Sequence, residues 1–298
     1  MPTASLALDG PAGLGLTLSP LRRGGTDPTF RTVDGVIWRT SLMRTGGVTA
    51  RLRSPDLTTV ECEVRGDGAA EFLDRLPGLV GAEDDATGFA PAEPTIAEAW
   101  RRVPHLRLCR TGRVLEVLIP AILEQRVQGR DAWNSFRILT MRYGAPAPGP
   151  APAGMRLPPT AGAWRRIPSW EFHRANVDPR RARTLVGCAQ RADALERLTA
   201  ETATTALMSL PGVGLWTAAE TVQKAFGDAD ALSVGDYHLA KMVGWTLLGH
   251  PIDDAAMVEL LEPLRPHRHR AVRLLEVSGL ARNPRFGARQ AIPSLKKI

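Results

Sequence analysis

Two stretches of helical pattern meet at a Pro-Gly-Val-Gly sequence, residues 211–214, and this junction limits the possible folds more than any other part of the chain. The spacing of apolar residues predicts one helix over 202–210 and a second over 215–226. Because so few residues separate them, the chain must reverse tightly. Glycine tolerates positive φ angles and lacks the Cβ atom that would keep a ligand away from the backbone. We therefore predict a helical hairpin with an accessible backbone.

The start of the second helix is a predicted anion site. Its first N–H groups point outward, and the helix dipole favours a negative charge there. A phosphate of a nucleic-acid backbone would satisfy both, and such a contact reads no base sequence. Val213, at the tip of the turn, would contact the sugar side of a groove. The alternative is an ordinary helical hairpin with a glycine turn, which a Gly-x-Gly pattern alone does not distinguish.

The rest of the chain predicts an α+β protein. Two strands, over 33–43 and 48–54, flank a Gly46-Gly47 turn, a third strand covers 58–66, and a helix begins at Asp67 and ends at Pro77. Beyond residue 92 the patterns are helical only, with Thr95 as a cap and Gly144 as a stop. We therefore predict an N-terminal α+β module over 1–92, a helical domain over 93–282 and a basic tail over 283–298.

Composition restricts the function. The 298 residues contain no apolar run long enough to span a membrane and no signal-peptide pattern, so we expect a cytoplasmic protein. Three scattered cysteines form neither a disulfide framework nor a metal quartet. The net charge is +7, and residues 261–298 alone carry nine basic against two acidic side chains. That segment is either a footprint for a polyanion or a solvated helix face followed by a loose tail.

Asp236 follows Trp216 by twenty residues and precedes a predicted helix over 237–248. Aspartate is a favoured N-cap, so a purely structural role is one interpretation. A cap position also holds a carboxylate at a helix end, where it can face a groove. The two roles are compatible.

The string Leu-Pro-Gly-Val-Gly-x-x-Thr-Ala at 210–218, together with Trp216 and Asp236, resembles the helix-hairpin-helix (HhH-GPD) base-excision DNA glycosylases related to endonuclease III. It is most similar to the bacterial 3-methyladenine DNA glycosylase II (AlkA-like) branch. The resemblance covers about residues 20–290. It implies a mainly α-helical HhH-GPD glycosylase core, with a cleft between two helical lobes, and a small N-terminal antiparallel α+β (TBP-like) module.

The resemblance also implies roles for individual residues. Asp236 would be catalytic, since an ionised carboxylate stabilises the positive charge that develops on the deoxyribose or activates water. Related lyases carry a nucleophilic lysine at the position of Trp216, so this chain would be monofunctional. Trp216 would stack on the extruded base, with Tyr237 also in the base pocket.

Two further residues of the expected pocket depart from the family pattern. Glu220 and Glu276 stand where the family's best-known member has aromatic residues. They would attract a cationic base, or one of them would protonate a leaving purine. Alternatively, both face solvent and the correspondence is off by one helical turn.

DNA contacts are expected at three places. The hairpin would bind the backbone through Leu210, Gly212, Val213, Gly214 and Thr217, with a monovalent cation on its carbonyls as in relatives. Gln125 or Arg126 would fill the hole left by the extruded base, unless they are polar residues of an ordinary helix. Phosphates would be held by Arg265, Arg268 and Arg270. No other cofactor is expected, and no cysteine after Cys188 could hold the iron–sulfur cluster of endonuclease III.

The expected function is that of a monofunctional DNA glycosylase in base excision repair. It would excise alkylated purines of the 3-methyladenine type from double-stranded DNA, as a monomer associated with the nucleoid. Two alternatives stay open: a glycosylase for an oxidised, deaminated or bulky lesion, and a non-catalytic DNA-binding protein with the same hairpin.

Overall fold

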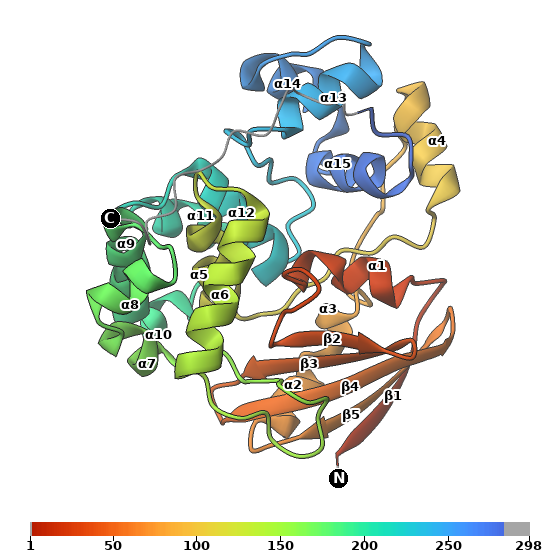
Figure 1. Ribbon diagram of the computed structural model, residues 1–298. Helices are drawn as coiled ribbons and strands as arrows, with labels where there is room; N and C mark the ends of the chain where they lie inside the picture. The colour runs from red at the N-terminus through yellow and green to blue at the C-terminus, as the bar shows by residue number, and fades with distance from the viewer. Residues whose placement is uncertain (1, 283–298) are drawn as a thin grey trace.

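A computed structural model describes residues 2–282, so the predicted tail over 283–298 lies outside the described residues. Near the N-terminus, five strands form one antiparallel sheet in the order β1-β5-β4-β3-β2 (Figure 1). The strands are β1 (Thr3–Ala7), β2 (Phe30–Val33), β3 (Val36–Leu42), β4 (Gly47–Asp56) and β5 (Thr59–Arg65). The predicted hairpin around Gly46-Gly47 is present as β3 and β4, which pair from Leu42–Gly47 to Ile37–Leu52. The predicted α+β class is confirmed.

The helix predicted to follow β5 is divided into two. The segments are α2 (Ala69–Asp74) and α3 (Leu76–Leu79), and Gly68 rather than Asp67 occupies the N-cap of α2. Pro77 lies in the first turn of α3, where its missing N–H costs no hydrogen bond. The prediction that Pro77 ends a helix is therefore wrong.

Helices α4 to α15 make up most of the remaining chain. In α4 (Pro94–Arg102) the cap is Glu93, whose carboxylate accepts from the Ile96 N–H, and not Thr95. Gly144 does end α6 (Gly129–Tyr143), as predicted. The other helices are α1 (Leu14–Leu18), η1 (Ser19–Leu21), α5 (Val114–Glu124), α7 (Ala161–Arg166), α8 (Ser169–Arg174), α9 (Pro179–Gln190), α10 (Ala192–Leu195), α11 (Ala200–Met208), α12 (Leu215–Ala225), α13 (Leu239–Leu247), α14 (Asp254–Leu261), η2 (Glu262–Leu264) and α15 (Arg268–Val277).

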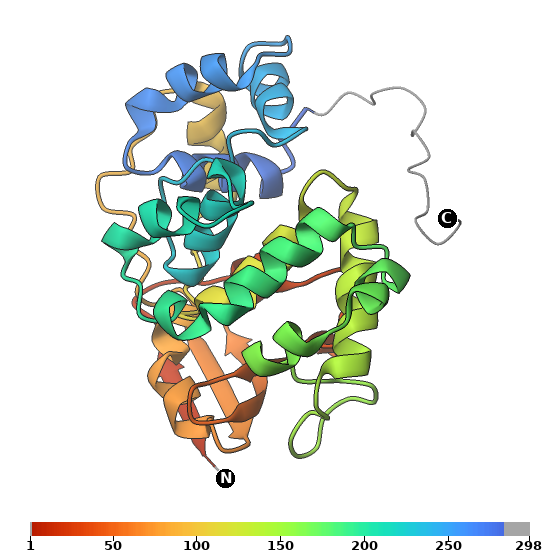
Figure 2. The ribbon, with the colours of Figure 1, turned by 90° about the vertical axis from the view of Figure 1, so that its left-hand side faces the viewer.

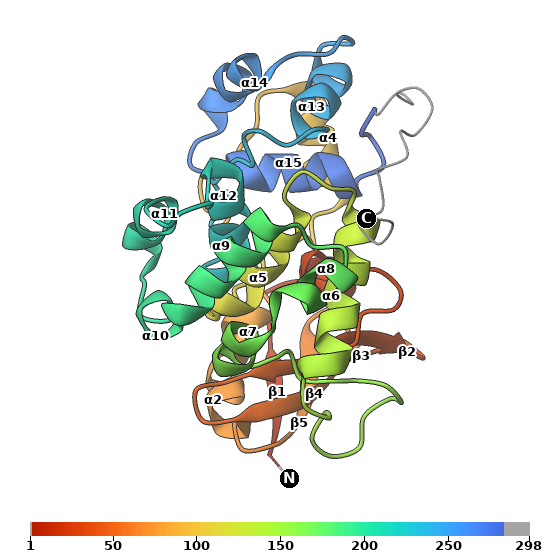
Figure 3. The same ribbon diagram turned by 60° about the vertical axis from the view of Figure 1, so that its left-hand side comes forward.

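Two hydrophobic cores divide the helices into two lobes. The first core joins the sheet to α5, α6, α9 and α12, so the sheet and the central helices form one packed body. The second core joins α4 to α13, α14 and α15, although α4 is more than 130 residues away in the sequence. Figure 3 shows this second lobe at one end of the molecule, with the sheet at the other end. The lobes meet beside α12, where the candidate site lies.

Candidate active site

The predicted hairpin connects α11 to α12 and packs on α9. Gly212 has φ +86°, and a Cβ atom there would lie 2.0 Å from the Thr184 Oγ1 atom of α9, so only glycine fits without movement. Gly214 is exposed and occupies the N-cap position of α12, where no side chain accepts a hydrogen bond from the first N–H groups of the helix. The first N–H groups of α12 are thus available to an anion.

Two of the predicted hairpin contacts need correction. The Val213 side chain is only 6% exposed and belongs to the first core, so it cannot reach a groove. Thr217 is buried, and its hydroxyl accepts a hydrogen bond from Gln125. The large exposed apolar side chain at the start of α12 is Leu215. Backbone contacts at Leu210, Gly212 and Gly214 remain a prediction.

The structure separates the two candidates for the wedge. The amide of Gln125 donates to the Gly212 carbonyl (3.0 Å) and to Thr217 Oγ1 (2.9 Å), which ties the end of α5 to the hairpin. Arg126 is exposed in the loop that follows, in a left-handed conformation with φ +55°. Of the two side chains, that of Arg126 is the exposed one, and the wedge role stays a prediction. The expected monovalent cation stays a prediction.

Asp236 accepts three hydrogen bonds. Its Oδ1 accepts from the N–H groups of His238 (2.8 Å) and Leu239 (3.0 Å) at the start of α13, and its Oδ2 accepts from Trp216 Nε1 (3.2 Å). The side chain is half-buried and lines a cavity. The helix predicted over 237–248 begins at Leu239 and has His238 as its N-cap, so the prediction that Asp236 is the N-cap is wrong. Asp236 instead holds the turn that precedes α13, and its catalytic role stays a prediction.

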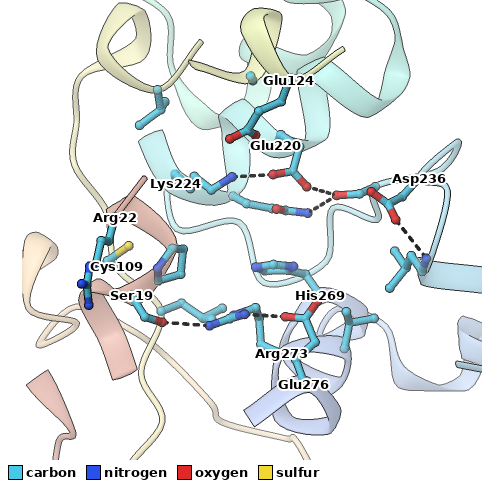
Figure 4. A pocket seen from close by; sticks show the side chains of 18 of the residues that line it. Ser19, Arg22, Cys109, Glu124, Glu220, Lys224, Asp236, His269, Arg273 and Glu276 are labelled. Carbon is cyan, nitrogen blue, oxygen red and sulfur yellow. Dashed lines mark hydrogen bonds and ion pairs between the residues drawn. The ribbon is translucent and has the colours of Figure 1, made fainter. Parts of the chain in front are cut away.

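The cavity has a volume of about 520 Å³ and lies between the lobes. Segments of both lobes line it, together with the α1–η1 segment of the N-terminal module (Figure 4). Glu220 from α12 and Glu276 from α15 both lie in its wall. Glu220 is partly buried, whereas Glu276 is also exposed to solvent. A volume of this size is typical of small-ligand sites.

Two predicted pocket residues are not in the cavity wall. Trp216 is absent from the lining, and its indole instead supports Asp236. Tyr237 is 69% exposed and contacts His238 and Lys241, the ammonium of which lies 4.3 Å from the ring centroid. These two aromatic residues are therefore outside the wall, which contains Trp133 of α6 and mixes apolar with polar and charged side chains.

A charged network lies in the cavity wall. Glu220 pairs with Lys224 one turn later in α12 and accepts from the Ser233 hydroxyl at 2.5 Å. Burial would raise the pKa of Glu220, but Lys224 and Ser233 outweigh it and hold the pKa below its usual range. Glu124, at the end of α5, also lines the cavity, and burial raises its pKa. Glu220 is thus ionised at neutral pH, while Glu124 is biased toward its protonated form.

Several cavity residues were not predicted from the sequence. The position of Lys224 four residues after Glu220 was the one available signal, since such residues share a helix face. The others come from segments that meet only in the fold: Arg23, Glu124, His269 and Arg273.

His269 is held neutral. Burial, with Arg273 adding to the effect, lowers its pKa to about 3. Below pH 6.5 the unfolded chain binds a proton that the folded chain does not, so stability falls as the pH drops from about 6.5 towards 3. Urea titrations at several pH values would measure the free energy of unfolding of the wild type and of His269→Gln. Over this interval the free energy of the variant should fall less steeply, by up to about 1.4 kcal/mol per pH unit. The same pH dependence of the free energy of unfolding in both proteins would contradict the neutral state of His269.

The predicted phosphate grip is wrong for two of its three arginines. Arg270 is 0% exposed, and its guanidinium pairs with Asp84 (2.7 Å) and donates to the Asp85 carbonyl. Arg268 pairs with Asp230 at 2.6 Å and is 9% exposed. These side chains attach α15 to neighbouring loops and are not available to phosphate. Arg265 is half-exposed and paired with acidic groups, and its role stays a prediction.

The exposed positive charge lies elsewhere. Residues 125–197 contain thirteen arginines and five acidic residues, a net charge of +8. The net charge of residues 1–260 is nevertheless zero, because the rest of that segment is acidic. The helices of this segment, coloured green, face the viewer in Figure 2. Many of these arginines are exposed: Arg126, Arg130, Arg142, Arg165, Arg166, Arg174, Arg180, Arg183, Arg191 and Arg197. Such a surface is suited to a polyanion.

Two negative findings apply to residues 2–282. In this part of the chain, no group of three or more His, Cys, Asp or Glu side chains is arranged to hold a metal ion. Within the same residues, every helix is too short or too polar to cross a bilayer.

No protein-family profile matches the sequence, and no curated protein does. Solved structures do match the fold. A 3-methyladenine DNA glycosylase from Archaeoglobus fulgidus superposes with a TM-score of 0.73 over 92% of this chain and 98% of its own, at 17% identity. An 8-oxoguanine glycosylase/lyase from Clostridium acetobutylicum, in complex with double-stranded DNA, superposes with a TM-score of 0.68 over 89% of this chain and 90% of its own, at 13% identity. A 3-methyladenine DNA glycosylase from Schizosaccharomyces pombe, in complex with abasic DNA, superposes with a TM-score of 0.51 over 64% of this chain and 94% of its own, at 17% identity. The chain therefore has the fold of the helix-hairpin-helix DNA glycosylases.

Proposed function

We propose that this protein is a monofunctional DNA glycosylase that extrudes a damaged purine from double-stranded DNA and hydrolyses its N-glycosidic bond. The observation that carries the proposal is the position of Asp236, a carboxylate fixed by two backbone N–H groups in the wall of a cavity beside the hairpin. The open helix start at Gly214 and the arginine-rich surface over 125–197 support binding of a nucleic-acid backbone.

The chemistry assigned to Asp236 is electrostatic. Cleavage of the bond between the base and C1′ leaves positive charge on the deoxyribose, and a nearby carboxylate stabilises that charge. Water then attacks C1′ and gives up a proton, which Asp236 can accept. The three donors on Asp236 hold its two oxygens in fixed positions, so little reorganisation accompanies the reaction.

The absence of strand cleavage follows from Trp216, since lyases of this fold carry a lysine nucleophile at that position. We propose alkylated purines of the 3-methyladenine type as the first substrate class. The hydrogen-bonding side chains in the cavity wall, such as Glu220 and Glu124, favour a second candidate class, damaged purines that are recognised by hydrogen bonds.

The test is an assay of abasic-site formation. Duplexes that carry 7-methylguanine, hypoxanthine or 8-oxoguanine are incubated with the protein and then cleaved with hot alkali. We expect release of at least one purine, no cleavage before alkali, and no covalent complex after borohydride treatment. A borohydride-trapped complex would exclude the monofunctional mechanism, and intact duplexes throughout would favour a non-catalytic DNA-binding protein.

Trp216→Phe should lower the rate of base release about tenfold, because the variant keeps the ring but loses the hydrogen bond to the Asp236 carboxylate. Single-turnover kinetics with a saturating excess of enzyme would measure this effect on the chemical step. If Trp216 instead stacks on the base, the variant should weaken binding and leave the single-turnover rate intact.

A further inference from the structure

Glu124 is a carboxyl group in the cavity wall to which the mechanism above gives no role. Its Oε1 accepts a hydrogen bond from Trp133 Nε1 at 3.1 Å, and no donor within residues 2–282 bonds to Oε2. The residue is the last of α5, next to Gln125, which is bonded to the hairpin. Figure 4 shows the Glu124 carboxyl directed toward Glu220 and Lys224 of α12. The hairpin, the wedge loop and this carboxyl are therefore held in one unit.

The surroundings of Glu124 and Glu220 favour different protonation states in the two side chains. Burial raises the pKa of Glu124, and Glu220 adds to this, while Lys224, Arg23 and the Trp133 N–H oppose it. The Lys224 ammonium forms an ion pair with Glu220, so it stabilises the ionised form of Glu220 more than that of Glu124. When the pKa of one carboxyl group is raised and that of its neighbour is lowered, the first can act as an acid while the second stays ionised.

On the basis of the proposed function, we propose that Glu124 is the general acid that protonates the leaving base, so that the cavity accepts uncharged damaged purines as well as cationic alkylated ones. The proton passes from Glu124 to a ring nitrogen of the purine. The bond between N9 and C1′ then breaks, and its electron pair stays with the base, which leaves as a neutral molecule. Asp236 stabilises the sugar cation until water adds to C1′, and solvent returns the proton to Glu124.

This role separates two kinds of substrate. A purine alkylated at N7 or N3 already carries a positive charge, so its departure requires no acid. Hypoxanthine is uncharged, and its departure gains from protonation by a factor of about 10² or more. A carboxyl with a purely structural role would affect the two bases alike.

The experiment measures single-turnover release of hypoxanthine and of 7-methylguanine from matched duplexes by the wild type and by Glu124→Gln. The amide keeps an acceptor for Trp133 but has no proton of suitable acidity. We expect the ratio of the hypoxanthine rate to the 7-methylguanine rate to fall about 100-fold. The control is Glu171→Gln, which alters a buried carboxylate of α8 outside the cavity, and it should keep the wild-type ratio.

A pH profile supplies an independent measurement. The hypoxanthine rate should fall as the pH rises through the pKa of Glu124, and the 7-methylguanine rate should show no such fall. Trp133→Phe removes a hydrogen bond that lowers this pKa, so it should move the fall to higher pH. This variant also keeps the proposal testable if Glu124→Gln does not fold.

The outcomes are distinct. Equal losses on both bases, or no change in the ratio, would show that Glu124 is not the acid. Wild-type release of 7-methylguanine without hypoxanthine would overturn the role of Glu124 and leave the proposed function intact. Release of neither base, nor of any lesion in the panel above, would overturn the proposed function and this inference with it.

Discussion

Asp236→Asn is expected to lower the single-turnover rate of base release about 10²- to 10³-fold, the effect typical of removing one preorganised electrostatic group. The variant loses the negative charge that faces the sugar cation. Its amide oxygen can still accept from the N–H groups of His238 and Leu239, so the turn before α13 is kept. The amide N–H₂ would meet the Trp216 N–H, which costs one hydrogen bond. Substrate binding and melting temperature should therefore change little.

Asp253→Asn is the matched control. Asp253 is the N-cap of α14 and accepts from the Ala256 N–H at 2.9 Å, so its carboxylate holds a helix start by backbone N–H groups as Asp236 holds the turn before α13. Asp253 lies outside the cavity wall. The variant should release base at the wild-type rate. If Asp236→Asn were as active as this control, the role of Asp236 would be structural only.

Arg270→Ala should destabilise the protein by about 3–5 kcal/mol, the effect typical of breaking a buried ion pair from one side. The substitution leaves the Asp84 carboxylate unpaired with only 5% of its side chain exposed. It also frees the Asp85 carbonyl, which Arg270 satisfies at 2.9 Å. Urea unfolding monitored by tryptophan fluorescence would measure the loss.

Two further variants test the cause of that loss. Arg265→Ala removes a half-exposed arginine from the same segment and should cost less than about 1 kcal/mol. Adding Asp84→Asn to Arg270→Met should recover part of the stability, because the charge is gone and the amide oxygen can still accept from the Leu108 N–H. If Arg270→Ala unfolded like Arg265→Ala while phosphate binding fell, the predicted phosphate grip would be restored.

The features that could be predicted from the sequence are local ones. The glycine pair at 212 and 214 specifies a tight turn by itself, and the helical period on either side identifies the hairpin. Asp236 could be singled out by its spacing of twenty residues from Trp216, but the prediction that it is an N-cap failed because α13 begins only at Leu239. The β3–β4 hairpin is likewise marked by its own turn.

The features that escaped prediction depend on distant contacts. Arg270 and Asp84 are 186 residues apart, so nothing in the segment 265–270 distinguishes a buried ion pair from a basic surface. The cavity wall combines Arg23, Glu124 and His269 from three separate segments. β1 lies at the sheet edge with no fully buried residue, so its sequence lacks a strong apolar alternation.

The central claim, that Asp236 faces the sugar cation of an extruded nucleotide, is tested most directly by binding to two abasic-site analogues. One duplex carries a pyrrolidine ring, which is protonated and mimics the charged sugar, and the other carries an uncharged tetrahydrofuran ring. We expect the wild type to bind the pyrrolidine duplex at least about tenfold more tightly, because analogues of the transition state gain the interactions made in it. Asp236→Asn should abolish this preference. Equal binding of both duplexes by the wild type, or an undiminished preference in the variant, would contradict the claim.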